Sequence, residues 1–204
     1  MDLQLEQSYV AEFSEAYAFQ KQKKLLLAFI EQRYSLLNEE FKEFLKAIKE
    51  NDTVELLDSL CDMKYIVLGT FHLLNAESYY FHSYDTIENL VLRSKEKTSL
   101  NYYLTIQARI LNWIRNKAIE LGFEKVFKEA FKRVHESNMS KFCANLDTVH
   151  RTISQPQYKD INTMNYVQRG NKYYVTIGKN NLDLAEGKLI KSIDYKKVYL
   201  SDLI

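Results

Sequence analysis

The chain has 204 residues, and its 28 lysine and arginine residues nearly balance its 27 aspartate and glutamate residues. This length fits one domain, or one domain with a small appendage, and the net charge of +1 gives no overall attraction to nucleic acid or to an anionic membrane. No apolar run reaches the roughly 18 residues that span a bilayer, and the N-terminal residues lack the pattern of a signal peptide.

The two cysteines, Cys61 and Cys143, form no metal-type pair and no disulfide framework, although one disulfide between them stays open at this point. Cys61 lies in an apolar stretch, where a thiol usually acts as a small core residue. This usage is typical of a reduced protein. We therefore expect a cytoplasmic chain that has neither nucleic acid nor membrane among its partners.

Helices dominate the first two thirds of the chain, because one proline and five glycines leave few breaks. Apolar spacing predicts a short amphipathic helix over about residues 7–20 and a long helix over about 24–49. The segment Asn51-Asp52-Thr53 interrupts this pattern. Asp52 or Thr53 can cap a next helix over about residues 54–74 by accepting a bond from a free backbone N–H.

The following part is mixed and then helical again. An aromatic and polar stretch begins near residue 76 and is followed by a short helix in the sequence IENLVLRS. We predict a long helix over about 100–121, ended by Gly122, and a further helix over about 124–136.

The C-terminal part changes to a pattern typical of strands. Alternating residues predict strands at 165–169, 172–178 and 188–195, with Tyr173, Val175 and Ile177 on one face. Gly170-Asn171 indicates a two-residue turn, and residues 180–187 a longer one. We expect a mainly α fold, a helical bundle over residues 1–143, followed by a C-terminal α+β appendage over 144–204 that contains a small antiparallel β meander.

Three carboxylates share one stripe of the predicted helix at 54–74. Relative to Asp58, Asp62 falls at about 40° and Glu55 at about 60° on a helical wheel. Leucine, valine, methionine and cysteine residues occupy most of the remaining circumference, as in a core helix. We therefore expect these acids to face inward.

The preceding predicted helix repeats this feature in the sequence NEEFKEF. Glu40 lies inside its apolar arc together with Arg33, Glu43 lies at the edge of the arc, and Glu39 is further toward solvent. A short linker makes the two helices antiparallel neighbours. Glu40 and Glu43 can then face the acidic stripe on the other helix.

Two interpretations of these acids are open. Charged residues on a helix usually form a solvated face, but burying several carboxylates without compensation costs several kcal/mol each. Oxygen ligands at i, i+3 and i+4 on facing helices suit Mg²⁺ or Mn²⁺, which leave positions open for phosphate and water. A di-iron bundle would need Glu-x-x-His on paired helices, and no histidine follows either motif at that spacing.

The two stripes resemble a known family. Arg33, the segment NEEFKEF (38–44) and the segment ELLDSLCDMKYIVLGT (55–70) are similar to the MazG-like, all-α nucleoside triphosphate pyrophosphohydrolases, which include dimeric dUTPases and phosphoribosyl-ATP pyrophosphohydrolases. Their signature is ExxE on one helix and ExxD on the next. The resemblance implies a metal-binding set, with Mg²⁺ or Mn²⁺ as cofactor, made of Glu40, Glu43, Glu55 and Asp58, and Asp62 is either a further metal ligand or a residue that supports the others. It also implies catalytic roles for Glu39 and Glu40, with Glu39 either a further ligand or the base that activates water.

A second block, VHESNMSKF (134–142), resembles a segment that follows the last helix in phage and bacterial members. It implies substrate binding by Asn138, Ser140 and Lys141, and Arg33 could bind substrate or instead pair with Glu40. The C-terminal residues resemble the β-hairpin tail of the same proteins. Residues 76–120 are longer than the connection expected there, and this insertion could form a dimerisation element or a lid. Trp113 and several tyrosines, among them Tyr102 and Tyr103, could stack on a base, although such aromatics more often lie in a core or interface.

The implied reaction is hydrolysis of a nucleoside triphosphate to a nucleoside monophosphate and pyrophosphate, which would control nucleotide pools. The alternatives are a phosphoribosyl-ATP pyrophosphohydrolase and a non-catalytic helical interaction module. No glycine-rich phosphate loop is present, which argues against a kinase or an ATP-driven motor. Helices this apolar need further partners to cover them, so a homodimer or homotetramer is expected.

Overall fold

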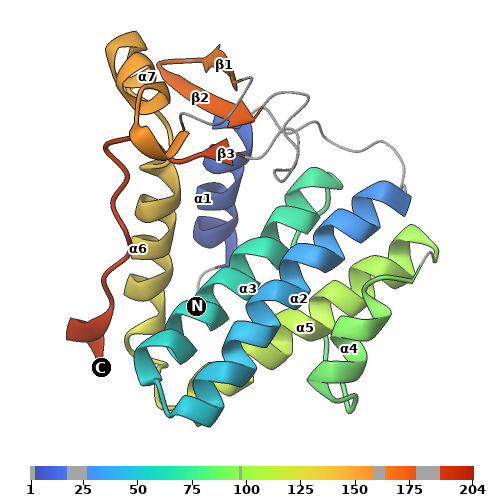
Figure 1. Cartoon of the computed structure of the whole chain (residues 1–204). Coiled ribbons are helices and arrows are strands. Elements are labelled where there is room, and N and C mark those ends of the chain that lie inside the picture. Colours follow the sequence, from blue (N-terminus) through green and yellow to red (C-terminus); the bar gives the residue numbers. More distant parts are fainter. Residues whose placement is uncertain (1–2, 18–26, 97, 159–163, 178–188) are drawn as a thin grey trace. The chain divides into compact units, whose positions relative to one another are not determined.

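The computed structural model describes residues 3–17, 27–96, 98–158, 164–177 and 189–204. Seven α-helices lie in this part of the chain, and a small three-stranded antiparallel sheet lies near its C-terminal end (Figure 1). The mainly α fold class with a C-terminal β meander is therefore confirmed. No helix of the described residues is long and apolar enough to cross a membrane.

Contacts divide the chain into two compact units. The first unit contains Met1–Ala11, Gln20–Val134 and Tyr199–Ile204, and the second contains Glu12–Phe19 and His135–Val198. The predicted domains, residues 1–143 and 144–204, stay a prediction.

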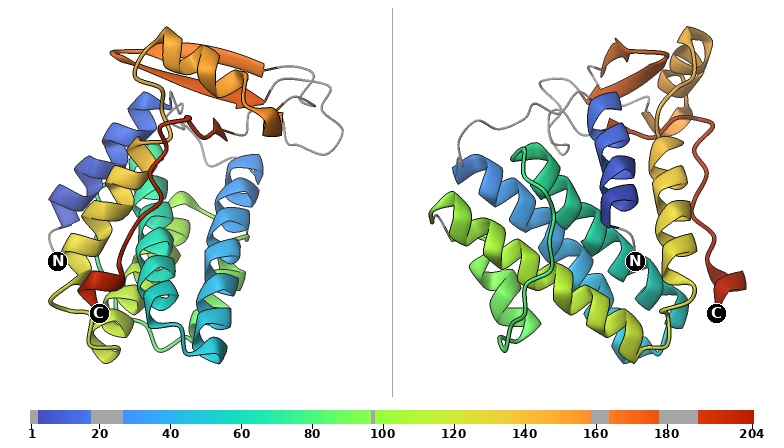
Figure 2. Two further views of the ribbon diagram at one scale, coloured as in Figure 1. Left: turned by 60° about the vertical axis from the view of Figure 1, so that its left-hand side comes forward. Right: turned by 180° about the vertical axis from the view of Figure 1, so that it is seen from behind.

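The first unit is built on two long antiparallel helices. Helix α2 (Leu27–Glu50) and helix α3 (Thr53–Leu73) lie side by side in every view (Figures 1 and 2). Helix α5 (Leu100–Glu120) packs against α3, and the short helix α4 (Ile87–Arg93) packs against α5 and α2. These bounds lie close to the predicted ones, and Gly122, at φ +81°, follows α5 at its predicted end.

The segment considered an insertion, residues 76–120, is thus part of the helical core of this unit. Helix α5 buries Tyr103, Ile106, Ile110 and Ile114 among its apolar residues. This burial explains why α3 has almost no polar face, since α2 and α5 both pack against it. The proposed roles of the segment as a lid or a dimerisation element stay predictions.

Helix α1 (Leu3–Ala16) and helix α6 (Phe127–Met139) begin in the first unit. Helix α6 begins and ends three residues later than predicted, because Val126 and Phe127 both donate backbone bonds to the carbonyl of Phe123 and form a turn before the helix. Helix α7 (Leu146–Ile153) was not predicted. Only eight residues long, it is capped by Asn145, whose side chain accepts a bond from the Thr148 amide.

The sheet of the second unit runs in the order β1–β2–β3. Strands β1 (Met164–Arg169) and β2 (Lys172–Ile177) pair through a two-residue turn with Gly170 at φ +54°, as predicted. Val175 and Ile177 of β2 pack with Cys143, Val149 and Ile190 in a small core, and Tyr173 lies against it. The predicted long turn at 180–187 lies outside the described residues.

The third strand is shorter than predicted. Strand β3 contains only Leu189–Ile190, whereas the prediction covered 188–195. Beyond it the backbone bonds to other elements: the Ser192 amide donates to the Lys141 carbonyl, and the Ile193 amide donates to the Thr152 hydroxyl. These bonds replace the pairing that would have continued the strand.

Candidate active site

A two-residue turn sets the register of the acidic residues. Asn51, at φ +54°, and Asp52 connect α2 to α3. The Asp52 side chain accepts a 3.0 Å bond from the Glu55 amide and caps α3, as predicted. Because the turn is tight, the two helices run antiparallel and their acidic stripes lie on neighbouring elements.

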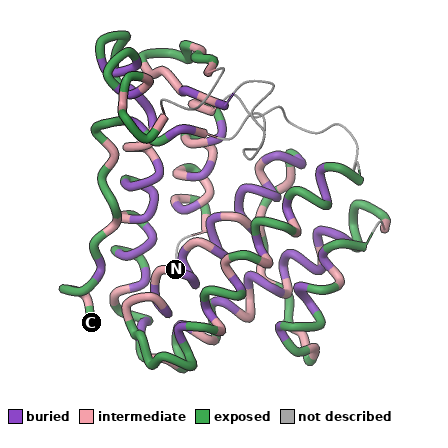
Figure 3. The backbone as a smooth tube through the Cα atoms, viewed as in Figure 1, coloured by how far each residue is buried: buried purple, intermediate pink, exposed green. Residues whose placement is uncertain are grey.

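Helix α3 is buried on most of its circumference, as the purple positions in Figure 3 show. Its acidic stripe is the exception. Glu55, Asp58, Asp62 and Ile66 are half-buried, while nearly all residues between them are buried. The acids therefore lie at the edge of the core rather than within it. At Asp58 one carboxylate oxygen, Oδ1, is itself buried.

Glu40 lies at the centre of the acidic cluster. Its pKa is raised to about 9. Burial is the largest cause, and the nearby charges of Asp62, Glu43 and Glu39 add to the rise. A hydrogen bond between the Glu40 and Glu43 side chains also contributes. A hydrogen bond between two carboxyl groups needs a proton on one of them, so near neutral pH the Glu40 carboxyl holds a proton.

The structure thus brings Glu39, Glu40 and Glu43 of α2 together with Asp62 of α3. We define these four residues as the acidic cluster. Asp58 lies near the edge of the acidic cluster. Burial raises the pKa of the Cys61 thiol, and the charges of Asp62 and Asp58 both add to this rise. Glu55 lies in the first turn of α3, beside the Asp52 cap.

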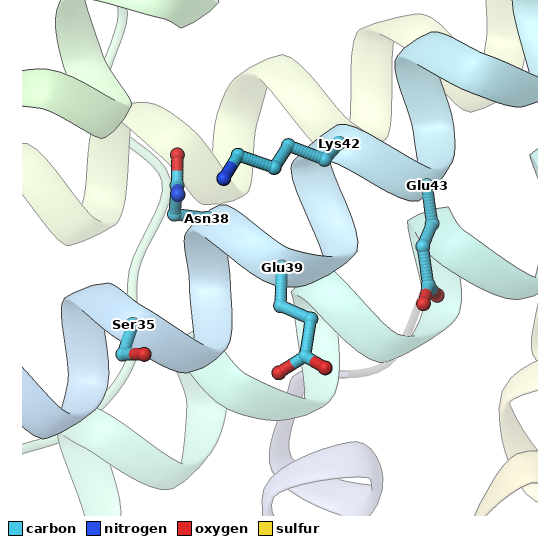
Figure 4. A pocket seen from close by; sticks show the side chains of 5 residues that line it. All are labelled: Ser35, Asn38, Glu39, Lys42 and Glu43. Carbon is cyan, nitrogen blue, oxygen red and sulfur yellow. The ribbon is translucent and has the colours of Figure 1, made fainter.

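A surface depression of about 380 Å³ lies along α2 beside this cluster. Ser35, Asn38, Glu39, Lys42 and Glu43 line it. Figure 4 shows the carboxylates of Glu39 and Glu43 on the same side of the helix, with Asn38 and Lys42 directed to the other side. Two of the cluster's carboxylates are therefore accessible to a ligand in this depression.

The chemistry of the acidic cluster fits a hard divalent cation. Four neighbouring carboxylates, one of them protonated because of its burial and of the charges around it, are the donors that Mg²⁺ or Mn²⁺ prefers. Within the described ranges, no three histidine, cysteine, aspartate or glutamate side chains already converge on one point that could hold a metal. A cation would therefore have to draw the carboxylates together and displace the proton of Glu40.

Arg33 is buried and bonded to α3. Its Nε donates a 3.0 Å bond to the Thr70 hydroxyl, and its Nη2 donates to the Ile66 carbonyl. Burial lowers its pKa to about 10, while Tyr103 acts in the opposite direction. Arg33 therefore bonds to Thr70 and Ile66 rather than forming the predicted ion pair with Glu40. Its predicted binding of substrate stays a prediction.

Gly69 and Thr70, which contact Arg33, were not predicted as site residues, and Tyr103 was predicted only as an aromatic that could stack on a base. Gly69 leaves room for the guanidinium, because a Cβ atom at this position would lie 3.1 Å from Arg33 Nη2. Thr70 accepts from the guanidinium, and Tyr103 contributes the phenol from α5. One signal was available: Gly69 lies seven residues after Asp62, on the same side of the helix.

The other predicted substrate residues belong to the second unit. Lys141 Nζ donates a 2.5 Å bond to Asn138 Oδ1, and the Ser140 hydroxyl donates to the Ser137 carbonyl and accepts from the Lys196 amide. Asn138 is buried. The structure therefore brings these three residues together at the end of α6, where they hold the segment that follows β3. Their binding to substrate stays a prediction.

Paired helices that gather carboxylates at an accessible edge define a class: a mainly α protein with a site built on carboxylates. Comparison with protein families agrees with this class. Residues 10–79, which contain both acidic stripes and Arg33, match the family of phosphoribosyl-ATP pyrophosphohydrolase. The resemblance to the MazG-like superfamily of pyrophosphohydrolases is thereby confirmed for this segment.

The chain is also similar to an uncharacterized protein, L479, of Acanthamoeba polyphaga mimivirus. The two are 24% identical over 215 residues, which cover 84% of this chain and 82% of the viral protein. No solved structure matches the chain.

Proposed function

We propose that this protein is a metal-dependent nucleoside triphosphate pyrophosphohydrolase, which converts a ribo- or deoxyribonucleoside triphosphate to the monophosphate and pyrophosphate. One observation carries the proposal. The acidic cluster around Glu40 lies within the segment that matches the pyrophosphohydrolase family. A half-buried carboxyl whose pKa is raised by burial and by three neighbouring acids is costly for the empty protein, and a bound cation would remove that cost.

Glu40, Glu43 and Asp62 would hold Mg²⁺ or Mn²⁺, with Asp58 and Glu55 at the edge of the set. A metal there supplies charge neutralisation on the phosphates and a more acidic bound water. The exposed Glu39 would accept the proton of the attacking water. The reaction needs positioning and neutralisation of charge rather than a covalent intermediate, and a set of carboxylates on two rigid helices suits this need.

The experiment is a pyrophosphate-release assay with the common ribo- and deoxyribonucleoside triphosphates, in the presence of Mg²⁺ or Mn²⁺. Glu40→Gln tests the cluster, and Glu31→Gln, an exposed acid on the same helix, is the matched control. We expect pyrophosphate and nucleoside monophosphate from the wild type and the control only. Release of single phosphate would point to a different phosphohydrolase chemistry.

Phosphoribosyl-ATP is a second candidate substrate, favoured by the family that residues 10–79 match. It belongs in the same assay, because it carries the same triphosphate group to the same residues. Turnover of this compound above all nucleoside triphosphates would assign the biosynthetic reaction. If no substrate is hydrolysed and neither metal stabilises the protein, a non-catalytic interaction module is favoured. A cytoplasmic homodimer or homotetramer remains our proposal for its location and assembly.

A further inference from the structure

Arg33 is a buried cation whose bonds go to uncharged oxygens. The residue is 8% exposed, and among the described residues its guanidinium bonds to the Thr70 hydroxyl and the Ile66 carbonyl. Buried charges in proteins are normally paired with an opposite charge, because removal from water costs several kcal/mol for an unpaired ion. The positive charge of Arg33 is therefore left without a compensating anion in this part of the chain.

Tyr103 of α5 adds a second incomplete group at the same place. Its side chain is 1% exposed, and its hydroxyl has no hydrogen-bond partner among the described residues. Burial raises the pKa of Tyr103 to about 12, and the charge of Arg33 opposes this rise, so the phenol is within electrostatic range of the guanidinium. A buried donor without an acceptor usually marks the place of a water, an ion or a ligand.

Arg33 lies on the same pair of helices as the acidic cluster. Arg33 precedes Glu40 by seven residues, which is about 10 Å along a helix axis. Ile66 and Thr70, which bond to Arg33, follow Asp62 by one and two turns on α3. The guanidinium and the acidic cluster therefore occupy two successive regions of the same helix pair, one positive and one negative.

We propose that Arg33 and Tyr103 form an anion site that binds a phosphate group of the substrate, about 10 Å along α2 from the acidic cluster. The inference rests on the proposed function, because it takes the substrate to be a phosphorylated compound whose other phosphates lie at the metal. The guanidinium supplies charge and free N–H groups, and the phenol donates its O–H to a phosphate oxygen. The site thus selects ligands long enough to reach from the metal to Arg33, such as those with a triphosphate chain.

The test uses inorganic tripolyphosphate as the probe and isothermal calorimetry as the measurement, with the full chain, in buffer with and without Mg²⁺. Tyr103→Phe removes only the hydroxyl, and Arg33→Lys keeps the charge but loses the planar donor set. Tyr102→Phe, the neighbouring exposed tyrosine of α5, is the control. We expect Tyr103→Phe to weaken binding about tenfold, as for loss of one hydrogen bond to a charged group, and Tyr102→Phe to leave it unchanged.

Tyr103→Phe keeps the proposal falsifiable even if Arg33→Lys fails to fold. Removal of an unpartnered buried hydroxyl leaves the free protein at least as stable as the wild type, which a thermal melt checks. If tripolyphosphate does not bind, or binds equally to the wild type and to Tyr103→Phe, the anion site is overturned and Arg33 only joins α2 to α3.

Failure of the proposed function gives a different result. If the wild type hydrolyses no nucleotide but binds tripolyphosphate through Arg33 and Tyr103, the anion site stands and the pyrophosphohydrolase assignment falls. If hydrolysis occurs and Tyr103→Phe raises KM without a change in tripolyphosphate binding, the phenol acts elsewhere and the inference falls alone.

Discussion

The carboxylates of Glu40 on α2 and Asp62 on α3 lie near enough across the helix pair for the charge of Asp62 to help raise the pKa of Glu40 to about 9. Asp62 was the acid whose role as a ligand the sequence left most open, since the ExxD signature matches Glu55 and Asp58. The charge of Asp62 nevertheless acts on Glu40, whereas Glu55, in the first turn of α3, is not among the acids that raise the pKa of Glu40.

The first prediction follows from the sign of this pKa change. Below about pH 4.5, the ordinary value of the group, Glu40 is protonated in both the folded and the unfolded chain. As pH rises toward 9, the unfolded chain loses this proton while the folded chain keeps it, so the free energy of unfolding falls. Without metal, the wild type should therefore lose thermal stability across this window relative to Glu40→Gln. If the melting temperatures of the two proteins changed in the same way from pH 5 to pH 9, the raised pKa of Glu40 would be contradicted.

The second prediction concerns the ligands themselves. Loss of a group that only supports a metal ligand typically lowers metal affinity or activity by roughly 10- to 100-fold. Asp62→Asn should lower both the affinity for Mg²⁺ or Mn²⁺ and kcat/KM by more than this, because Asp62 is itself proposed as a ligand. Glu55→Gln should have the smaller effect, because Glu55 is not among the acids that act on Glu40. Metal titration by calorimetry measures both. If Glu55→Gln caused the larger loss of metal affinity, the ExxD residues Glu55 and Asp58 would be the main ligands.

The third prediction tests the space that Gly69 provides. Alanine in place of a helical glycine normally stabilises by about 1 kcal/mol. Here the new Cβ would lie 3.1 Å from Arg33 Nη2 and 3.4 Å from Val10 Cγ1, and Arg33 is fixed by its bonds to α3. Gly69→Ala should therefore lower the free energy of unfolding in the wild type and raise it when Arg33 is already alanine. Urea unfolding of the double-mutant cycle gives the coupling, which would be zero if the two residues did not touch.

The fourth prediction concerns a buried ion pair on another side of α3. Lys64 Nζ lies 2.6 Å from Glu6 Oε1, both side chains are at most 2% exposed, and the ammonium lies over the rings of Phe127 and Phe131. Lys64→Met should cost about 3–5 kcal/mol, because it leaves the Glu6 carboxylate buried without its partner. The double variant Lys64→Met with Glu6→Leu should recover most of this loss. Equal destabilisation of the single and double variants would mean that packing, rather than the unpaired charge, sets the cost.

Local sequence features predicted the helices and the hairpin well. The cap at Asp52, the end of α5 at Gly122 and the turn at Gly170 each depend on a few neighbouring residues, and the structure confirms them. Helix α7 and the short β3 depend instead on bonds to distant elements, such as the Ile193 amide to the Thr152 hydroxyl. Periodicity within a window contains no information on such bonds.

The candidate site shows the same division. The spacing of Glu40, Glu43, Asp58 and Asp62 on two adjacent helices was sufficient to predict that acids would gather. The environment of Arg33 was not predictable, because it depends on α5. In particular, Tyr103 is distant in sequence from Arg33 and meets it only after the helices have packed.

The two-residue turn between α2 and α3 has a consequence for how the protein acquires its acidic cluster. All four members lie within residues 39–62, so a single helical hairpin supplies them. Closing so short a loop costs little entropy, and contacts this local form early in folding. The register of the cluster is therefore set within this one hairpin: one extra residue inside α3, between Thr53 and Asp62, would turn Asp62 by about 100° around the helix axis and carry it away from Glu40.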